Sequence, residues 1–329
     1  EAVGQAPRAT YLYSGVADLA ALTGDEAYTQ ALLRLWQDVI GHKLYITGGI
    51  GSHHENEGFG EPYELPNLTA YTETCAAISL SMWAVRMFQL LGDAQFIDVL
   101  ERTLYNNFLA GASLSGDRFF YACPPESDGD FAFNVGWMPR GYTGPYEDAS
   151  ATRKAWFVCA CCPPNFARWL EQGPGFAYAV GPDGLYVNLF IAGEARLDLA
   201  GRPVTVTQRT RYPWDGRIRL DVVNEQAAAF PVPSRVPGWA REEPVPSNLY
   251  RYTDGGAVEP PTLQVNGESM PVDIEQGFVR IDRLWHPGDV VELHLPMPVR
   301  FVRAHPKVDA ARGKIALERG PLVYCLEGV

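Results

Sequence analysis

Apolar residues in the first half of the chain recur with the period of an α-helix. The pattern predicts helices over residues 8–22, 26–40, 70–91 and 94–109. The first of these helices carries one apolar stripe, made of Leu12, Val16, Leu19 and Ala20. The third is apolar on nearly every face, so we expect it to lie buried at the centre of a helical domain.

After Gly111 the helical period weakens, and residues 112–155 predict short strands and turns. A last helical stretch follows the sequence CACCPPN at residues 159–165. About five helices are therefore expected in the first half of the chain.

From Gly173 onward the period changes to two, which is typical of strands with one buried face. Turn signals separate the alternating stretches at residues 182–184, 215–216, 266–267 and 287–289. Short antiparallel strands with regular spacing and Gly/Pro turns predict a β-sandwich. We expect the domain boundary in the Gly-Pro-Gly stretch at 173–175, which separates a helical domain (1–172) from a β-sandwich part (173–329).

Both ends of the chain suggest a longer parent protein. The first residue is Glu1, and a helical pattern begins almost at once. The last residues include a strand-like run at 321–325. We therefore expect both ends to be cuts through a longer sequence.

The composition indicates a folded protein and argues against some classes of partner. Of the 329 residues, 47% are hydrophobic and 20% are charged, and the formal net charge is −12. So acidic a chain disfavours binding to nucleic acid or anionic membranes, which requires clustered Lys and Arg. No apolar run approaches the roughly 18 residues that a membrane helix needs. We expect no nucleic-acid and no membrane partner, and we leave open whether the protein forms a homo-oligomer.

Six cysteines occur, at positions 75, 123, 159, 161, 162 and 325. An even number can form disulfides in a small secreted protein, but a chain of this length has enough core to fold without them. Three of the six lie within four residues, where disulfide geometry rarely allows pairing. Clustered thiols in a large chain more often bind metal or carry out chemistry. We therefore expect reduced cysteines and a cytoplasmic protein.

Cys161 and Cys162 are followed directly by two prolines. A residue before proline avoids the helical conformation, so Cys162 is expected to be extended. Pro164 suits the first turn of the helix that follows. The two cysteines would then lie at a helix N-terminus, whose dipole favours thiolates. The alternative is that both are small buried apolar side chains.

Glu73 and Cys75 form a second candidate pair. In a regular helix their side chains would point about 200° apart, so they can share an ion easily only where the backbone is extended or turning. A glutamate at the start of a helix is also a common partner of the helix dipole. Together with Cys161 and Cys162, the pair makes one carboxylate and three thiolates, a set suited to zinc.

The loop at residues 52–68 carries four glutamates among glycines and aromatic residues. Such a glutamate can donate a proton in a sugar pocket, or it can simply be solvated. The pattern alone does not favour Glu57 over Glu55. His53 and His54 in the same loop are candidate metal ligands by residue type, although isolated histidines in polar loops are more often ordinary surface residues.

Several segments resemble glycoside hydrolase family 127, the β-L-arabinofuranosidase family. In the first half they are YITGGIG (45–51), YELPN (63–67), ETC (73–75) and CACCPPN (159–165). In the second half they are VPGW (236–239), QVNG (264–267) and ERGPLVY (318–324). The resemblance spans nearly the whole chain, and the combination of ETC with CCP is its most specific part.

The resemblance implies an (α/α)6 barrel followed by β-sandwich domains, with the earlier barrel helices absent from this chain. It implies that Zn2+ is held by Glu73, Cys75, Cys161 and Cys162. Cys161 would attack the anomeric carbon, and Glu57, sixteen residues before Glu73, would be the acid/base. Two successive inversions would retain the configuration of that carbon. The implied substrate is an oligosaccharide or glycan that carries a β-L-arabinofuranoside.

One position departs from the family pattern. In the segment VGQAPR (3–8), Gln5 stands where the family usually has a histidine close to the sugar. Glutamine keeps hydrogen-bonding capacity but does not titrate. We expect Gln5 to bind the sugar, and we keep open that the sugar is another L-sugar.

Two other functions compete with this hypothesis. In a non-catalytic protein, the same four ligands could form a closed structural zinc site that braces a carbohydrate-binding sandwich. Glu57 beside a sugar-sized pocket at Cys161 would distinguish an enzyme from such a protein. An isomerase or lyase on a similar helical barrel would instead need His or Tyr as acid/base and no thiolate.

Overall fold

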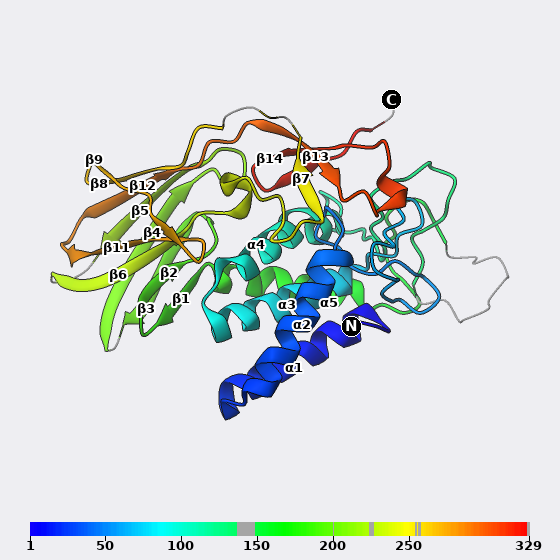
Figure 1. Ribbon diagram of the computed structural model, residues 1–329, viewed down its shortest axis with the longest axis horizontal. Helices are drawn as coiled ribbons and strands as arrows, with labels where there is room; N and C mark the ends of the chain where they lie inside the picture. Colours follow the sequence, from blue (N-terminus) through cyan, green and yellow to red (C-terminus); the bar gives the residue numbers. More distant parts are fainter. Residues whose placement is uncertain (137–148, 200, 224–226, 254, 256–257, 328–329) are drawn as a thin grey trace.

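The computed structural model describes residues 1–136, 149–199, 201–223, 227–253, 255 and 258–327. Helices occupy the first half of the chain and strands the second, which confirms the expected order. Figure 1 shows the two larger sheets at one end of the molecule, with the helices beside them and a smaller sheet of late strands above the helices.

Five α-helices precede residue 173 in the described part of the chain. They are α1 (Ala6–Thr23), α2 (Glu26–His42), α3 (Thr74–Leu91), α4 (Ala94–Thr103) and α5 (Cys162–Gln172). Two short helices continue from them: the π-helical η1 (Leu104–Phe108) after α4 and the 3-10 helix η2 (Gly173–Phe176) after α5. Aspartates cap α2 and α4, because the carboxylates of Asp25 and Asp93 accept hydrogen bonds from backbone N–H groups of the first turn.

Helix α3 lies at the centre of the helical part, as its pattern predicts. Trp83 of α3 packs against Tyr13 of α1 and Trp36 of α2, with ring centroids 5.0 Å apart in both pairs. Among the described helices, α3 alone is long and apolar enough to cross a bilayer, which corrects the expectation that no such run exists. Because 72% of it is buried inside the fold, we interpret it as a core helix.

The face of α1 that packs on the core matches the predicted stripe only in part: Ala20 is buried and Val16 packs against the core, but the two leucines are not buried. Leu12 and Leu19 are 64% and 47% exposed. The buried side is made of small and hydroxyl-bearing residues, namely Ala6, Thr10, Ser14, Ala17 and Ala20. These let α1 approach α3 so closely that Thr10 Oγ1 and Ser79 Oγ lie 2.6 Å apart. The prediction was wrong for the two leucines because hydrophobicity does not measure side-chain size, and close helix contact favours small residues.

Other boundaries also differ from the prediction. Helix α3 begins at Thr74 rather than at residue 70, and the helical hydrogen-bond pattern changes to that of a π-helix after Thr103. The strands expected in residues 112–155 are isolated bridges, such as those that join Phe119 to Ala112 and to Lys154. Residues 137–148 of that stretch lie outside the described residues.

The strands within the described residues form three sheets. The first contains, in spatial order, β1 (Tyr178–Gly181), β2 (Gly184–Val187), β6 (Ala228–Arg235), β11 (Phe278–Trp285) and β10 (Ile274–Glu275). The second contains β3 (Gly193–Leu199), β4 (Arg202–Thr210), β5 (Arg217–Val223), β12 (Asp289–His294), β8 (Thr262–Val265) and β9 (Glu268–Met270). The third contains β15 (Leu322–Tyr324), β14 (Ala316–Arg319), β13 (Val299–Ala304) and β7 (Tyr250–Tyr252).

The first and second sheets share one buried core. Val232 and Ile281 of the first sheet and Leu220 and Leu293 of the second belong to the same hydrophobic cluster. Hairpins form at the predicted turns 182–184 and 266–267. Among the described strands, one pairing departs from the antiparallel expectation, because β2 runs parallel to β6. A long connection through the second sheet separates these two strands in sequence, which permits the parallel direction.

Helix α4 is joined to the sheets by buried ion pairs. Arg235 of β6 is fully buried, and its guanidinium contacts the carboxylates of Asp98 (2.6 Å) and Glu101 on α4. The Tyr212 hydroxyl also donates to Glu101, at 2.7 Å. Arg102 pairs with the buried Glu318 of β14 at 2.8 Å. These contacts hold the helical part against two different sheets.

We predict that Arg235→Met lowers the free energy of unfolding by about 3–5 kcal/mol, because it leaves the buried Glu101 carboxylate without its cation and removes one of the two arginines that contact Asp98. The matched control is Arg196→Met, since Arg196 makes a solvent-exposed pair with Glu194. Removing that pair should cost about 1 kcal/mol or less. Urea unfolding measures both changes. Equal losses in the two variants would contradict a structural role for the buried pair.

Candidate active site

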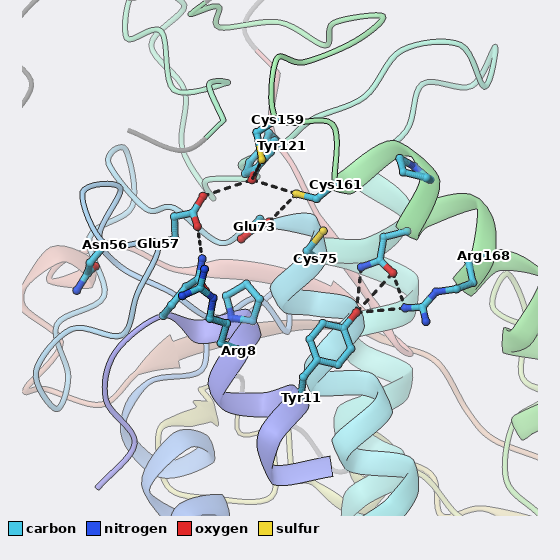
Figure 2. Close-up of a pocket in the computed structure, with 14 residues that line it drawn as sticks. Arg8, Tyr11, Asn56, Glu57, Glu73, Cys75, Tyr121, Cys159, Cys161 and Arg168 are labelled. Carbon is cyan, nitrogen blue, oxygen red and sulfur yellow. Dashed lines mark hydrogen bonds between the residues drawn. The ribbon is translucent and has the colours of Figure 1, made fainter. Parts of the chain in front are cut away.

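A cavity of about 850 Å³ lies between the N-terminal ends of α1, α3 and α5 (Figure 2). Its size is within the range of pockets for small ligands. The start of α1 contributes Gln5, Pro7, Arg8 and Tyr11; the start of α3 contributes Glu73 and Cys75; and α5 contributes Cys161, Pro164, Asn165 and Arg168. Asn56, Glu57, Tyr121 and Cys159 complete the wall. Five of the six site residues that the family resemblance implies thus line one cavity, and the sixth, Cys162, is buried.

Cys161 and Cys162 lie at the N-terminus of α5, as predicted. Cys161 is the N-cap residue, and Cys162 is the first helical residue. The expectation that Cys162 is extended is therefore wrong. Its local preference is outweighed by tertiary contacts, because the buried Cys162 Sγ lies 3.4 Å from Cys75 Sγ and 3.5 Å from Glu73 Oε1.

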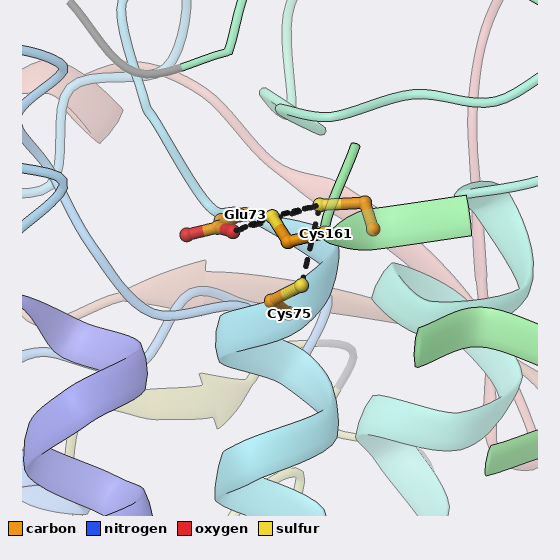
Figure 3. Close-up of side chains that lie close together, drawn as sticks. Glu73, Cys75 and Cys161 are labelled. Carbon is orange, nitrogen blue, oxygen red and sulfur yellow. Dashed lines mark hydrogen bonds between the residues drawn. The ribbon is translucent and has the colours of Figure 1, made fainter. Parts of the chain in front are cut away.

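Glu73 and Cys75 do not share a regular helix. Helix α3 begins at Thr74, and Glu73 is its N-cap, with φ −59° and ψ 141°. The geometric objection to their sharing an ion therefore does not apply. Glu73 Oε1 contacts the sulfurs of Cys161 and Cys162, and Cys75 Sγ contacts Cys162 Sγ, so the carboxylate and the thiol both point toward the start of α5 (Figure 3).

The four side chains form one compact group. The candidate ligand atoms of Glu73, Cys75, Cys161 and Cys162 all lie within 4.8 Å of one another. Cys161 Sγ is 3.4 Å from Glu73 Oε1 and 3.7 Å from Cys162 Sγ. All six cysteines of the chain are free thiols. The group could hold a metal ion.

These distances fit a tetrahedral zinc site. Metal–sulfur bonds of about 2.3 Å place two sulfur ligands about 3.8 Å apart. The sulfur–sulfur distances of 3.4 and 3.7 Å are close to that value. Glu73 Oε1 lies 3.4 Å from Cys161 Sγ and 3.5 Å from Cys162 Sγ, so it is the carboxylate oxygen placed to bind the same ion.

The electrostatics of the group favour a single negative charge, and a bound cation would allow more. Burial and the negative charges of Cys161 and Glu57 raise the pKa of Glu73 well above its ordinary value. Hydrogen bonds from Cys162 and Cys75 lower the pKa of Cys161. Burial raises the pKa of Cys162. One thiolate is thus favoured at Cys161, and further negative charge in the group requires a positive ion.

Glu57 lies on the opposite wall of the cavity. It is buried, has a positive φ of 51°, and its carbonyl accepts a hydrogen bond from the N–H of Ala6 at 2.9 Å. A bridge between Gln5 and Gly58 continues this contact. These backbone contacts fix the loop to the start of α1. The side-chain amide of Gln5 also donates a hydrogen bond to the Glu57 carboxylate. Glu55, by contrast, is exposed.

Two tyrosines complete the site and were not found from the sequence. The Tyr71 hydroxyl donates to Glu57 Oε1 at 2.7 Å. The Tyr121 hydroxyl lies 3.3 Å from the same oxygen and 3.0 Å from Cys161 Sγ, and thus links the two candidate catalytic groups. The sequence does offer a signal for Tyr71, because it lies two residues before the candidate ligand Glu73. Tyr121 lies in a stretch without a clear period, so no local signal identifies it.

The two histidines of the loop lie outside the group of four candidate metal ligands. His53 Nε2 lies 3.2 Å from a carboxylate oxygen of Glu64. His54 packs edge-on against Tyr71, with ring centroids 5.0 Å apart. Burial lowers the pKa of His54 to about 4, so its ring is neutral near pH 7. His54 therefore supports the tyrosine that holds Glu57.

The sequence matches family profiles along most of its length. Residues 1–175 match the β-L-arabinofuranosidase GH127 catalytic domain. Residues 184–297 match the GH127 middle domain, and residues 299–329 match the C-terminal domain of glycoside hydrolase family 127. The chain belongs to glycoside hydrolase family 127. The resemblance carried by the ETC and CACCPPN segments is confirmed.

Relatives of this GH127 chain are about twice as long. A non-reducing end β-L-arabinofuranosidase from Bifidobacterium longum subsp. longum is 36% identical over 336 residues, which cover 99% of this chain and 46% of that protein. A solved GH127 β-arabinofuranosidase is 45% identical with a TM-score of 0.89, over 98% of this chain and 48% of that one. A GH127 β-L-arabinofuranosidase from Geobacillus stearothermophilus T6 is 40% identical with a TM-score of 0.86. The match covers 99% of this chain and 47% of that one. The chain thus spans about half of each relative.

Proposed function

We propose that this GH127 chain carries the reactive half of a retaining glycoside hydrolase that releases L-arabinofuranose, or a related L-sugar, from β-linked glycans. Zinc is bound by Glu73, Cys75, Cys161 and Cys162. Cys161 is the nucleophile and Glu57 the acid/base. The names of the relatives support the choice of sugar.

One observation carries the proposal: Cys161 Sγ and Glu57 Oε1 both contact the hydroxyl of Tyr121 at the wall of the cavity. A nucleophile and a carboxyl group that flank a glycosidic bond are the two groups that a retaining hydrolase needs. A closed structural metal site needs no such carboxyl group beside it. The geometry therefore favours an enzyme over the zinc-braced binding protein.

The residues divide the reaction between them. Zinc, when bound, keeps the cysteine sulfurs deprotonated near neutral pH. The Cys161 sulfur attacks the anomeric carbon while Glu57 gives its proton to the departing glycosidic oxygen. Glu57, now a carboxylate, then takes a proton from a water molecule, whose oxygen displaces the sulfur from the same carbon. Each step inverts the carbon once, so the product keeps the configuration of the substrate.

Gln5 is the proposed contact to the sugar, because it lines the cavity and its side-chain amide donates a hydrogen bond to the Glu57 carboxylate. We also propose that residues 1–172 form part of an (α/α)6 barrel, that residues 173–329 form a β-sandwich unit, and that the protein is located in the cytoplasm.

The test of the activity uses the full-length parent enzyme and p-nitrophenyl β-L-arabinofuranoside. We expect release of the chromophore and, by NMR, L-arabinofuranose that first appears as the β-anomer. If another L-furanoside is the better substrate, the proposed mechanism still holds and only the proposed sugar is wrong. Saturable binding of the sugar without turnover would instead support the zinc-braced carbohydrate-binding protein.

The metal content is a separate prediction. We expect about one zinc ion per chain in protein purified without chelator, with Zn–S distances of about 2.3 Å. Elemental analysis measures the stoichiometry, and X-ray absorption measures the distances. A folded, metal-free protein whose thiols at Cys75, Cys161 and Cys162 all react freely would exclude the zinc site.

A further inference from the structure

We propose that a clamp around Thr72 allows Glu73 and Cys75 to bind the same metal ion. The clamp consists of the glycine-rich loop at residues 48–51, Asn107 of η1 and the carbonyl of Cys123. This inference rests on the proposed zinc site. It assigns a role to the YITGGIG segment and to the π-helical turn, neither of which the proposed reaction uses.

Thr72 has an uncommon backbone conformation. Its φ is +38°, although β-branched residues rarely adopt positive φ, and it is fully buried. Such outliers persist only where the surroundings enforce them. The turn at Thr72 leaves Glu73 extended, before the first residue of α3. If the chain were helical here, Glu73 and Cys75 would project about 200° apart.

Three hydrogen bonds hold Thr72 in this turn. Its N–H donates to the carbonyl of Gly51 at 2.9 Å. Its hydroxyl donates to the carbonyl of Cys123 at 2.7 Å. Its own carbonyl accepts from the side-chain amide of Asn107 at 3.3 Å. Every polar atom of Thr72 is thus bonded to a segment outside α3, so the turn cannot relax into the helix without breaking these contacts.

Asn107 and Gly49 fit together beside Thr72. Asn107 is 1% exposed, and its backbone N–H donates to the carbonyl of Thr47 at 3.0 Å. A Cβ atom on Gly49 would lie 2.5 Å from Asn107 Oδ1 and 3.0 Å from Thr72 Cγ2. Only glycine leaves both side chains in place. The π-helical turn matters because its extra residue changes the direction in which successive side chains point.

The preceding residue provides a matched control. Asn106 has the same side chain in the same turn and is also buried. Its amide nitrogen donates to the carbonyls of Arg102 (2.8 Å) and Pro321 (2.9 Å), and its oxygen accepts from the N–H of Val323 (2.8 Å). Asn106 is therefore hydrogen-bonded to the third sheet, whereas Asn107 is hydrogen-bonded to Thr72, the residue before Glu73.

The experiment measures zinc affinity in the full-length parent enzyme by competition with a chromophoric chelator, together with the thermal midpoint of unfolding. We expect Asn107→Ala to weaken zinc binding about 10–100-fold, and Asn106→Ala to change it less than about threefold. Both variants should lower the midpoint. Asn107→Asp, which keeps the shape and loses the donor, and Gly49→Ala should weaken zinc binding in the same direction, so the test does not depend on one variant that folds poorly.

Zinc affinities of the Asn107 variants equal to the wild-type value, or equal losses in the Asn106 and Asn107 variants, would overturn the clamp. In that case the wild-type enzyme still binds zinc, and the proposed function stands. If the wild-type enzyme itself binds no zinc, the proposed metal site and the clamp both fall. The two failures are therefore distinguishable.

Discussion

Replacing Cys161 with serine in the full-length parent enzyme is expected to lower kcat/KM for an L-arabinofuranoside by more than about 10³-fold. A serine hydroxyl is a much weaker nucleophile unless a base removes its proton. The Tyr121 hydroxyl, which contacts Cys161 Sγ at 3.0 Å, is no such base, because burial raises its pKa above the ordinary value. The loss should therefore appear in kcat, measured with the p-nitrophenyl substrate.

Cys159→Ser is the comparison variant for this prediction. Cys159 lines the same cavity but lies outside the group of four candidate ligands. We expect its kcat/KM to fall about tenfold at most, since it neither attacks the sugar nor binds the ion. Zinc content is measured in both variants, because Cys161 is also a proposed ligand. Undiminished turnover in Cys161→Ser would return Cys161 to a purely structural role.

Replacing Glu57 with glutamine should lower turnover of a natural glycan about 10²–10⁴-fold, the usual contribution of a positioned acid/base. Glutamine has nearly the same shape but cannot supply a proton to the departing oxygen. Zinc should remain bound, because Glu57 is not one of the four grouped ligands. The first step should be partly spared with a p-nitrophenyl substrate, because that leaving group needs little protonation.

The Glu57 variant should also accumulate the intermediate. With no base to activate water, the sugar stays on the sulfur, and mass spectrometry should find it on Cys161. Glu55→Gln is the control, because Glu55 is an exposed carboxylate two residues earlier in the same loop. It should retain wild-type turnover. An adduct on a glutamate, or equal losses in the two variants, would contradict the assigned roles.

Residue type and family resemblance were enough to select the four grouped side chains from the sequence. A thiol pair followed by two prolines indicates a helix N-terminus, and α5 does begin at Cys162. The spacing of Glu73 and Cys75 was ambiguous, because it suits one ion only if a turn separates them. The turn depends on Gly51, Asn107 and Cys123, which are distant in sequence. A local pattern therefore could not decide the question.

Local periodicity predicted most of the helices and strands, because burial on one face imposes a repeat that short segments display. It identified the buried core helix α3 and the change to strands after Gly173. It wrongly placed Leu12 and Leu19 of α1 on the buried face, because that helix packs on α3 through Thr10, Ser14 and small residues. Apolar character predicts burial only when the size of the facing residue also allows it.

The chemistry of the site was thus encoded in residue types, whereas its geometry came from long-range packing. Glu57, Tyr121 and Cys161 are far apart in the chain and meet only because their segments are held at the N-terminal ends of α1, α3 and α5, which lie around one cavity. The role of Tyr121 has no local signature, since a tyrosine in an irregular stretch shows no period or motif. Such a contact depends on the folded positions of separate segments, and only the tertiary structure contains that information.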